Sequence, residues 1–346
     1  MVSFFLLYQH YIMYNYVIIG GGIAGIISLS VIYDRYPDAR ILWIDNNNFT
    51  SGDLIKYPLV PANTPYKVLV YFIETIFKLL GFKRTISQVC DLTNDRIFKL
   101  ECLSKELIII SNFIRKLKRV TLANDYINKV SYKDGNWIIS GKYTTYISEK
   151  VVLCNGSTHK KLSYNTPQIP IETALNPIKL NLLDIQDKHI VVFGNSHSGI
   201  LIIKNLYEMG CTNITNVVRG PIRIPYFNED NVEIYQESGI RGSGLEWVSK
   251  NLIPKNKTHI KIIKFNELTT FSADLVIYSI GLKPREIDII YNGGSFIRNP
   301  DFNETGLLAR NLYGLGVAYP KFYILNDNIE YEVGMGGFLE RALSIF

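Results

Sequence analysis

The chain has 346 residues, about twice the length of a typical domain, so two domains are expected. Apolar residues make up 47 % and charged residues 20 %, a balance that excludes a disordered chain, a coiled coil and a collagen-like fibre. The formal charge of +6 suits an anionic small ligand as well as nucleic acid, so the charge does not choose between these partners.

The N-terminus is apolar and aromatic, but it is too short to span a bilayer and lacks the basic start and cleavage site of a signal peptide. We expect residues 1–13 to be a leader or a loosely attached tail, or Met13 to be the natural start. No later stretch reaches membrane length without a charge or a proline, which predicts a protein with no membrane span. The four scattered cysteines form no C-x-x-C pair and indicate a reducing, cytoplasmic environment.

The N-terminal part predicts one βαβ unit followed by smaller elements. The runs at 16–20 and 39–45 are continuous and apolar, as strands of a parallel sheet covered on both faces require, and a helix is expected between them. The pattern then predicts, in chain order, a long loop at 46–66, a helix at 66–80, short alternating strands over 97–149 and a buried strand at 150–154.

A second βαβ unit follows a proline-containing connector at 163–187. Its expected elements are a strand at 189–193, a helix at 200–210 and a strand at 212–219, and a further buried strand covers 273–281. The same pattern therefore occurs twice, which indicates two related nucleotide-binding units rather than a short-period repeat.

The first glycine turn, residues 20–25, fits the pattern G-x-G-x-x-G between a strand and a helix. Its glycines permit a tight turn, close approach of the backbone to a pyrophosphate and close helix–strand packing, and the helix N-terminus offers N–H groups to phosphates. Asp45, at the end of the next strand, can accept hydrogen bonds from ribose hydroxyls. The predicted contacts with a dinucleotide are those of Gly20, Gly22, Ile23, Ala24, Gly25 and Asp45.

The second glycine turn, residues 194–199, has a serine in the middle position, and the strand after its helix ends in an arginine where the first unit has a carboxylate. A guanidinium can bind a ribose 2′-phosphate that a carboxylate would repel, so this unit predicts NADPH. The predicted contacts are those of Gly194, Ser196, His197, Gly199, Arg219 and Arg223. A polar loop residue remains the alternative for His197, and a solvated charge for the two arginines.

Two such units, with buried strands that lead to Gly156 and Gly281, resemble the two-dinucleotide-binding flavoproteins of the pyridine nucleotide-disulfide oxidoreductase superfamily. The resemblance covers nearly the whole chain from Tyr14 and implies an α/β fold of two Rossmann-like, doubly wound domains, the second inserted into the first. It implies an FAD-binding domain at 14–170 and 275–346 and an NADPH-binding domain at 171–274. It also implies cofactor contacts at Gly156, Gly281 and the backbone of Gly316.

Within the superfamily, the close cysteine pair of the disulfide reductases is absent, and residues 57–67 resemble a flavin-containing monooxygenase segment with an Asn-Thr pair. That resemblance places Asn63 near the flavin ring as the candidate catalytic residue, where its amide could hydrogen-bond the nicotinamide or flavin-bound oxygen. A turn-forming Asn between two prolines is the alternative. The F-x-G-x-x-x-H signature of N-hydroxylating and Baeyer–Villiger enzymes is absent.

The resemblance thus implies hydride transfer from NADPH to FAD, followed by monooxygenation of a small nitrogen or sulfur nucleophile. A flavin-dependent reductase of a non-disulfide acceptor and a non-catalytic redox sensor remain the alternatives. We expect no metal, because the five histidines show no zinc-site spacing. We expect no nucleic-acid partner, because the basic run at 115–119 is typical of a solvated face beside a helix end.

Overall fold

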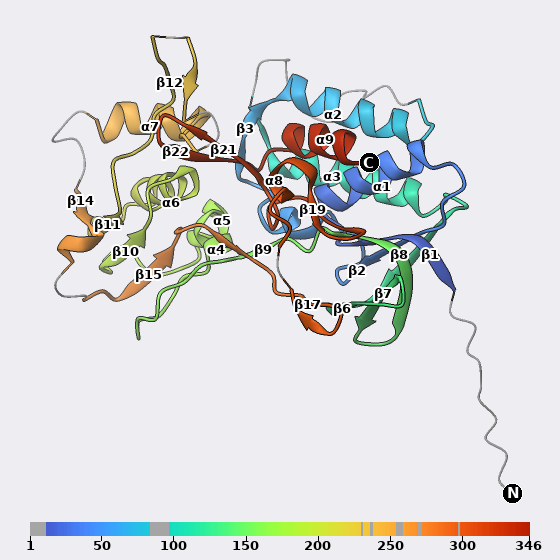
Figure 1. Ribbon diagram of the computed structural model, residues 1–346. Coiled ribbons are helices and arrows are strands. Elements are labelled where there is room, and N and C mark those ends of the chain that lie inside the picture. The colour runs from blue at the N-terminus through green and yellow to red at the C-terminus, as the bar shows by residue number, and fades with distance from the viewer. Residues whose placement is uncertain are drawn as a thin grey trace, which may run out of the picture.

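The computed structural model describes residues 12–83, 97–229, 231–235, 238–253, 259–268, 272–296 and 298–346. These residues form two lobes, each organised around a parallel sheet (Figure 1). Residues 1–11 of the expected leader lie outside the described residues, whereas Met13 begins the first strand and pairs with Ile147.

The first lobe is built on a ten-stranded sheet with a parallel centre. The parallel strands lie in the order β5 (Val120–Asn124), β2 (Ile41–Asp45), β1 (Met13–Ile19), β8 (Thr145–Leu153) and β20 (Leu312–Gly314). The N-terminal half of β8 pairs with antiparallel β7 (Asn136–Gly141). From there the sheet continues through β6 (Ile127–Lys133) and β17 (Asp288–Tyr291) to β18 (Gly294–Ser295). A short strand, β19 (Leu307–Ala309), pairs with β20.

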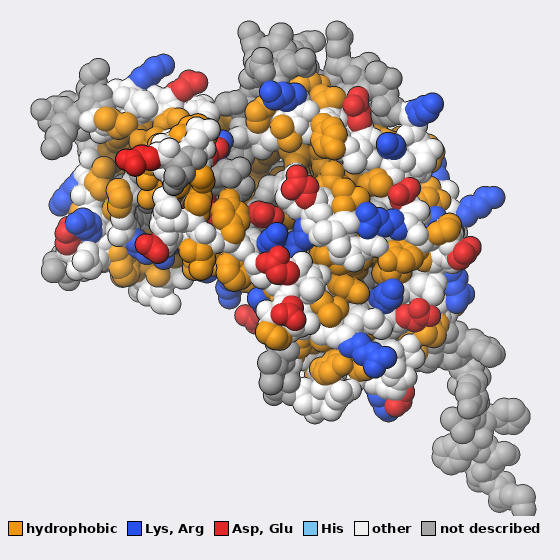
Figure 2. Space-filling view, turned by 45° about the horizontal axis from the view of Figure 1, so that its top comes forward, with side chains coloured by type: hydrophobic (Ala, Val, Ile, Leu, Met, Phe, Trp, Pro, Cys, Tyr) orange, Lys and Arg blue, Asp and Glu red, His pale blue; other side chains and the backbone are white. Residues whose placement is uncertain are grey.

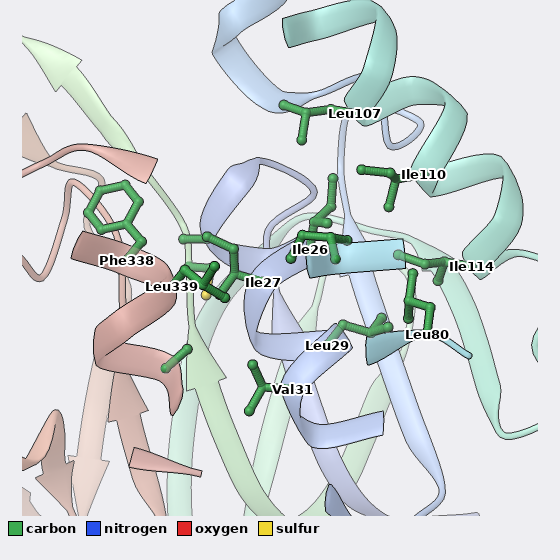
Figure 3. Packing of buried hydrophobic residues seen from close by; sticks show 14 of the residues in the cluster. Ile26, Ile27, Leu29, Val31, Leu80, Leu107, Ile110, Ile114, Phe338 and Leu339 are labelled. Carbon is green, nitrogen blue, oxygen red and sulfur yellow. The ribbon is translucent and has the colours of Figure 1, made fainter. Parts of the chain in front are cut away.

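Helices cover one face of this sheet: α1 (Ile23–Arg35), α2 (Tyr66–Leu79), α3 (Leu100–Ile114) and α9 (Met335–Ile345). The central helix α1 is apolar on nearly every side and lies between α3 and α9 (Figure 3). Ile26 points toward Ile110, and Ile27 lies beside Leu339. This burial orients the N-terminus of α1, and therefore the first glycine turn, relative to the strand ends.

The second lobe has a four-stranded parallel sheet in the order β14 (Ile260–Lys264), β11 (Ile214–Val218), β10 (Ile190–Phe193) and β15 (Leu275–Tyr278). Its main apolar cluster packs against α4 (Ile171–Ala174), α5 (Pro177–Leu180), α6 (His197–Glu208) and α7 (Gly242–Asn251). A small hairpin joins β12 (Tyr226–Phe227) to β13 (Glu233–Ile234).

Two connectors join the lobes and pair with each other. The chain leaves the first sheet after β8 through β9 (Ser157–His159) and returns through β16 (Leu282–Pro284), which is antiparallel to β9. After the return, β17 and β20 rejoin the first sheet. The topology therefore confirms the predicted α/β fold with one Rossmann-like domain inserted into another.

Smaller elements complete the described chain: η1 (Gly52–Lys56), β3 (Pro61–Pro65), β4 (Ile97–Lys99), η2 (Phe265–Glu267), α8 (Phe302–Thr305), β21 (Lys321–Leu325) and β22 (Asn328–Glu332). The β21–β22 hairpin reaches the second lobe (Figure 1). There the buried carboxylate of Glu330 accepts hydrogen bonds from the amide and the hydroxyl of Ser238 at 2.8 and 2.7 Å.

One predicted boundary is wrong. Residue 275 is the expected start of the second part of the first domain, but β15, which begins there, pairs in parallel with β10 of the second sheet. A continuous apolar run is equally suited to a central strand of either sheet, so only the pairing decides to which sheet it belongs.

The expectation of strands alone over 97–149 is also wrong, because residues 100–114 form α3. Three consecutive isoleucines at 108–110 favour a strand locally. The core-facing residues Leu103, Leu107, Ile110 and Ile114 nevertheless recur every three or four positions, which is the helical spacing. Farther along the same range the expected strands do form, and Asp134 and Gly135 have positive φ in the turn between β6 and β7.

Charges are mixed over the surface. On the face that Figure 2 presents, acidic and basic side chains lie interspersed rather than in separate areas. In the basic run, Arg115 donates to the carbonyl of Asn48 and Arg119 to those of Tyr33 and Tyr36. Within the described ranges, no helix is long and apolar enough to cross a membrane.

The close packing of α1 on β1 predicts the outcome of a pair of glycine-to-alanine substitutions. A Cβ at Gly25 would lie 1.9 Å from the carbonyl oxygen of Gly20, so Gly25→Ala should lower the free energy of unfolding by about 2–4 kcal/mol. A Cβ at Gly336, in α9, would meet no neighbouring atom within 4 Å, so Gly336→Ala should leave stability unchanged or raise it. Urea unfolding of both variants measures this, and equal stability of the two would contradict it.

Candidate functional site

The first glycine turn is held by contacts that leave no room for a side chain. A Cβ at Gly20, whose φ is +122°, would lie 2.1 Å from the carbonyl oxygen of Cys154. At the N-cap of α1, a Cβ at Gly22 would meet only Cα of Gly52, at 3.9 Å, and the first helical turn has no acidic residue. The start of α1 is therefore open and offers uncapped backbone N–H groups, which fits a bound diphosphate.

Asp45 is buried beside this turn and holds it. One carboxylate oxygen, Oδ1, accepts from the amide of Gly21 at 2.9 Å, and the other, Oδ2, accepts from the amides of Asn47 and Phe49 at 3.0 and 2.8 Å. A carboxylate has about four lone-pair positions, so Oδ1 retains acceptor capacity for a hydroxyl. Asp45 therefore positions the turn in addition to the predicted ribose contact.

The three remaining glycines of the first domain's predicted site occupy two different places. Gly316, with φ of +90°, crosses the first turn of α1, where a Cβ would lie 2.7 Å from that of Ala24. Gly156 and Gly281 lie in the connectors instead: Gly156 beneath the guanidinium of Arg285, and Gly281 with its carbonyl accepting from the amide of Lys160. Gly316 therefore contacts the first turn of α1, whereas the contacts of Gly156 and Gly281 are with the connectors.

The second glycine turn repeats the same geometry. A Cβ at Gly194 would lie 2.1 Å from the carbonyl oxygen of Ser279, and one at Gly199 would lie 2.4 Å from that of Gly194. At the N-cap of α6, Ser196 makes no side-chain cap bond, and the first turn has no acidic residue. This helix N-terminus is therefore equally suited to a phosphate.

The two predicted arginines lie in the loop that follows β11. The side-chain amide of Asn195 donates to the carbonyl of Gly220 at 2.8 Å, which brings the exposed Arg219 beside the second glycine turn. Arg223 lies farther along, with its guanidinium 5.4 Å from the ring centre of Tyr235. The structure thus groups Arg219 with the turn and places Arg223 toward β13.

His197 occupies the first helical position of α6, where its ring packs against α7. A Cβ at Gly244 would lie 3.6 Å from Nδ1 of His197. Both ring nitrogens are buried and have no hydrogen-bond partner among the described residues, and this burial lowers the pKa of His197. A neutral imidazole therefore lies between the N-termini of α6 and α7.

A cleft of about 350 Å³ lies between the lobes. Its lining combines β3 of the first lobe with the β12–β13 region and α7 of the second: Asn63, Pro65, Pro225, Glu233, Arg241, Gly242 and Leu245. Arg241 and Glu233 form an ion pair at 2.6 Å. The exposed Asn63 and this ion pair of the other lobe therefore line the same open cleft.

A polar cluster that the sequence analysis missed lies where the connectors meet η1. The hydroxyl of Tyr57 and Nε2 of His159 are 2.7 Å apart, and Arg285 forms an ion pair with Asp53. Burial, reinforced by the charges of nearby carboxylates, raises the pKa of Tyr57 to about 12, and burial lowers the pKa of His159. These pairs join residues 102 and 232 positions apart, so no sequence motif marks them.

The free thiols are buried. Cys154 follows β8, with its sulfur 3.6 Å from the hydroxyl of Ser28, and burial raises its pKa to about 12. Burial also raises the pKa of Cys211 in the second lobe. Both are thiols rather than thiolates at neutral pH, so neither is an activated nucleophile. In the described part of the chain, His, Cys, Asp and Glu form no group of three that could hold a metal ion.

The two buried histidines predict how stability depends on pH. An unfolded imidazole binds a proton with a pKa of about 6.5, whereas burial holds the pKa of His159 and His197 below that value in the folded chain. The unfolded state therefore binds more protons below about pH 6.5, and the free energy of unfolding should fall as the pH drops from about 7.5 to about 5.5. Urea unfolding of the wild type and of a His159→Gln, His197→Gln variant measures the effect. An identical pH dependence in both proteins would argue against it.

Comparisons with known proteins agree with this geometry. Residues 14–299 match the family described as pyridine nucleotide-disulphide oxidoreductase. The monooxygenase AgnR1 of Paecilomyces divaricatus is 21 % identical over 94 % of this chain and 95 % of its own length.

Solved structures share the fold. A flavin-containing monooxygenase from Stenotrophomonas maltophilia has a TM-score of 0.64 at 12 % identity, covering 96 % of each chain. A bacillithiol disulfide reductase from Staphylococcus aureus has a TM-score of 0.60 at 16 % identity, covering 96 % of this chain and 97 % of its own. The family consists of FAD-containing, NAD(P)H-dependent oxidoreductases, so the expected superfamily and enzyme class are confirmed. With its match to residues 14–299 and its two glycine turns, the chain belongs to the pyridine nucleotide-disulphide oxidoreductase family.

Proposed function

We propose that the chain is an FAD-dependent NADPH oxidoreductase that monooxygenates a small nitrogen or sulfur nucleophile. When bound, FAD supplies the chemistry: it accepts a hydride from NADPH and delivers the electrons to oxygen. In the complete reaction, one atom of O₂ joins the substrate nitrogen or sulfur, and the other leaves as water with the two electrons from NADPH.

The observation that carries the proposal is the repetition of one geometry in both lobes. Each lobe has a parallel sheet, a turn whose first and last glycines leave no room for a side chain, and an uncapped helix N-terminus. The first turn would hold the diphosphate of FAD, with Asp45 and the backbone of Gly316 beside it. The second would hold that of NADPH, with Ser196 and His197 beside it.

The cleft supports a role for Asn63. Asn63 lines this cleft from the first lobe, and the ion pair of Arg241 and Glu233 lines it from the second. A neutral amide can both donate and accept hydrogen bonds, so Asn63 can orient a nicotinamide amide or a bound substrate without adding a charge. The match to a monooxygenase over 94 % of the chain favours oxygenation as the second half-reaction.

The charge of Arg219 predicts a preference for NADPH over NADH. A guanidinium bonded to a 2′-phosphate contributes about 1.5–3 kcal/mol, so Arg219→Ala should weaken NADPH binding by about 10- to 100-fold and leave NADH binding unchanged. Stopped-flow reduction of the flavin under anaerobic conditions, over a range of each nucleotide, measures both affinities. Arg40→Ala, which removes an exposed arginine from the first lobe, is the control. Equal affinities of the wild type for the two nucleotides would remove this role of Arg219.

Oxygenation is tested by following the label from ¹⁸O₂ into a panel of amines and thioethers. We expect ¹⁸O in one product, with NADPH consumption matching product formation. Asn63→Ala should reduce product per NADPH about tenfold while flavin reduction continues, because an unoriented substrate leaves the electrons to form hydrogen peroxide. Asn136→Ala, in a hairpin of the first lobe, should behave as the wild type. Hydrogen peroxide as the only oxygen product for every substrate would exclude oxygenation under these conditions.

A reductase is the second candidate, because the bacillithiol disulfide reductase shares this fold over 96 % of the chain. The chain has no C-x-x-C pair, so a reductase built this way would pass electrons from the flavin to an external acceptor. Rapid turnover with an artificial acceptor, without ¹⁸O incorporation, would favour it. Absence of flavin reduction by either nucleotide would favour a redox sensor.

A further inference from the structure

The first glycine turn lies between two segments that are distant in sequence. On one side is η1, where a Cβ at Gly52 would lie 3.0 Å from Cα of Gly22. On the other side is the outgoing connector, the segment from residue 154 through β9 by which the chain leaves the first lobe. A Cβ at Gly20 would lie 3.4 Å from the amide nitrogen of Asn155 in this segment. Displacement of either segment would therefore open the turn to solvent.

Arg285, in the returning connector, joins these two segments. Its Nη2 forms an ion pair with Asp53, the residue after Gly52, and its Nη1 donates to the carbonyl of Asn155 at 3.1 Å. The side-chain amide of Asn155 donates in return to the carbonyl of Arg285 at 2.7 Å. One guanidinium thus spans from η1 to the outgoing connector.

Gly156 makes room for this arrangement. Its φ is +67°, and a Cβ at this position would lie 2.8 Å from Nη1 of Arg285. The amide of Arg285 also donates to the carbonyl of Gly156 at 3.0 Å. The glycine that the sequence analysis assigned to cofactor contact therefore accommodates the arginine side chain.

Asp53 is held as a carboxylate between two cations. Lys56 also pairs with Asp53, at 2.7 Å, so two cations flank one carboxylate. Burial of Asp53 opposes ionisation, but the hydrogen bonds and charges of Lys56 and Arg285 outweigh it and hold its pKa below the usual range. Asp53 is therefore ionised at neutral pH and keeps its charge-assisted pair with Arg285.

We propose that Arg285 is a positioning residue for FAD, which holds η1 and the outgoing connector closed on the first glycine turn. The inference rests on the proposed function and extends it to a residue outside both glycine turns. Because Arg285 belongs to the chain that returns from the second lobe, closure of the FAD site depends on the docking of that connector. Arg285 acts through protein contacts, so its loss should weaken FAD retention rather than alter the chemistry of the flavin.

The test measures FAD binding to the full-length protein after removal of its flavin, by the quenching of flavin fluorescence. Arg285→Met and Asp53→Asn should each raise the dissociation constant for FAD about tenfold, as expected for loss of a charge-assisted pair. The double variant should be no weaker than the single variants, because both remove the same interaction. Arg285→Lys should recover part of the affinity, since a lysine can still pair with Asp53.

The control is an ion pair in the second lobe, between Lys204 and Glu208 of α6, whose charged atoms are 2.7 Å apart. Neither residue lies in a glycine turn or in the lining of the cleft at Asn63. Lys204→Met should leave the FAD dissociation constant unchanged. Thermal unfolding of each flavin-free variant establishes that it is folded, and Asp53→Asn serves as the test if Arg285→Met does not fold.

The outcomes separate this inference from the proposed function. A wild-type protein that takes up no FAD would overturn both. Wild-type binding together with unchanged affinity in Arg285→Met or in Asp53→Asn would overturn this inference alone. An equal loss in Lys204→Met would also overturn it, because the effect would then not be specific to the first glycine turn.

Discussion

Both lobes depend on the same steric constraint, the contact of a glycine backbone with a neighbouring strand. At the end of β1, Gly20 lies against the carbonyl of Cys154, and at the end of β10, Gly194 lies against that of Ser279. Each contact is too short for any side chain. It allows the helix that follows to begin directly over the strand ends, and the helix N-terminus then becomes the place where phosphate charge is stabilised.

The polar side chains around the first glycine turn form hydrogen bonds and ion pairs with the protein itself. All three described hydrogen bonds of the Asp45 carboxylate go to backbone amides of the turn and the loop after β2. Arg285 and Asp53 likewise bond to protein and bring distant segments together. The site is therefore preorganised, so little ordering of the chain has to accompany cofactor binding.

Because one domain is inserted into the other, the lobes contact each other at several places. Because the chain enters and leaves the second lobe through paired connectors, β9 and β16, the two sites share one boundary. The cleft at Asn63 and the cluster around Arg285 both lie along it, and the Glu330 carboxylate of the β21–β22 hairpin adds a further contact between the lobes. Val60 of the first lobe also packs into the apolar core of the second.

The features that could be predicted from the sequence rest on local constraints: the two strand–turn–helix units, the glycines at their turns and the choice of a carboxylate or an arginine after the next strand. These follow from short-range sterics and periodicity, which a linear pattern records. The helix at 100–114 is also marked by the spacing of its core-facing residues, but the three isoleucines favour a strand. The pairing of β15 with the second sheet and the contact of Gly156 with Arg285 could not be predicted in this way. Each of these two depends on a partner far away in the chain, and such pairing leaves no periodic or spaced signal in the sequence.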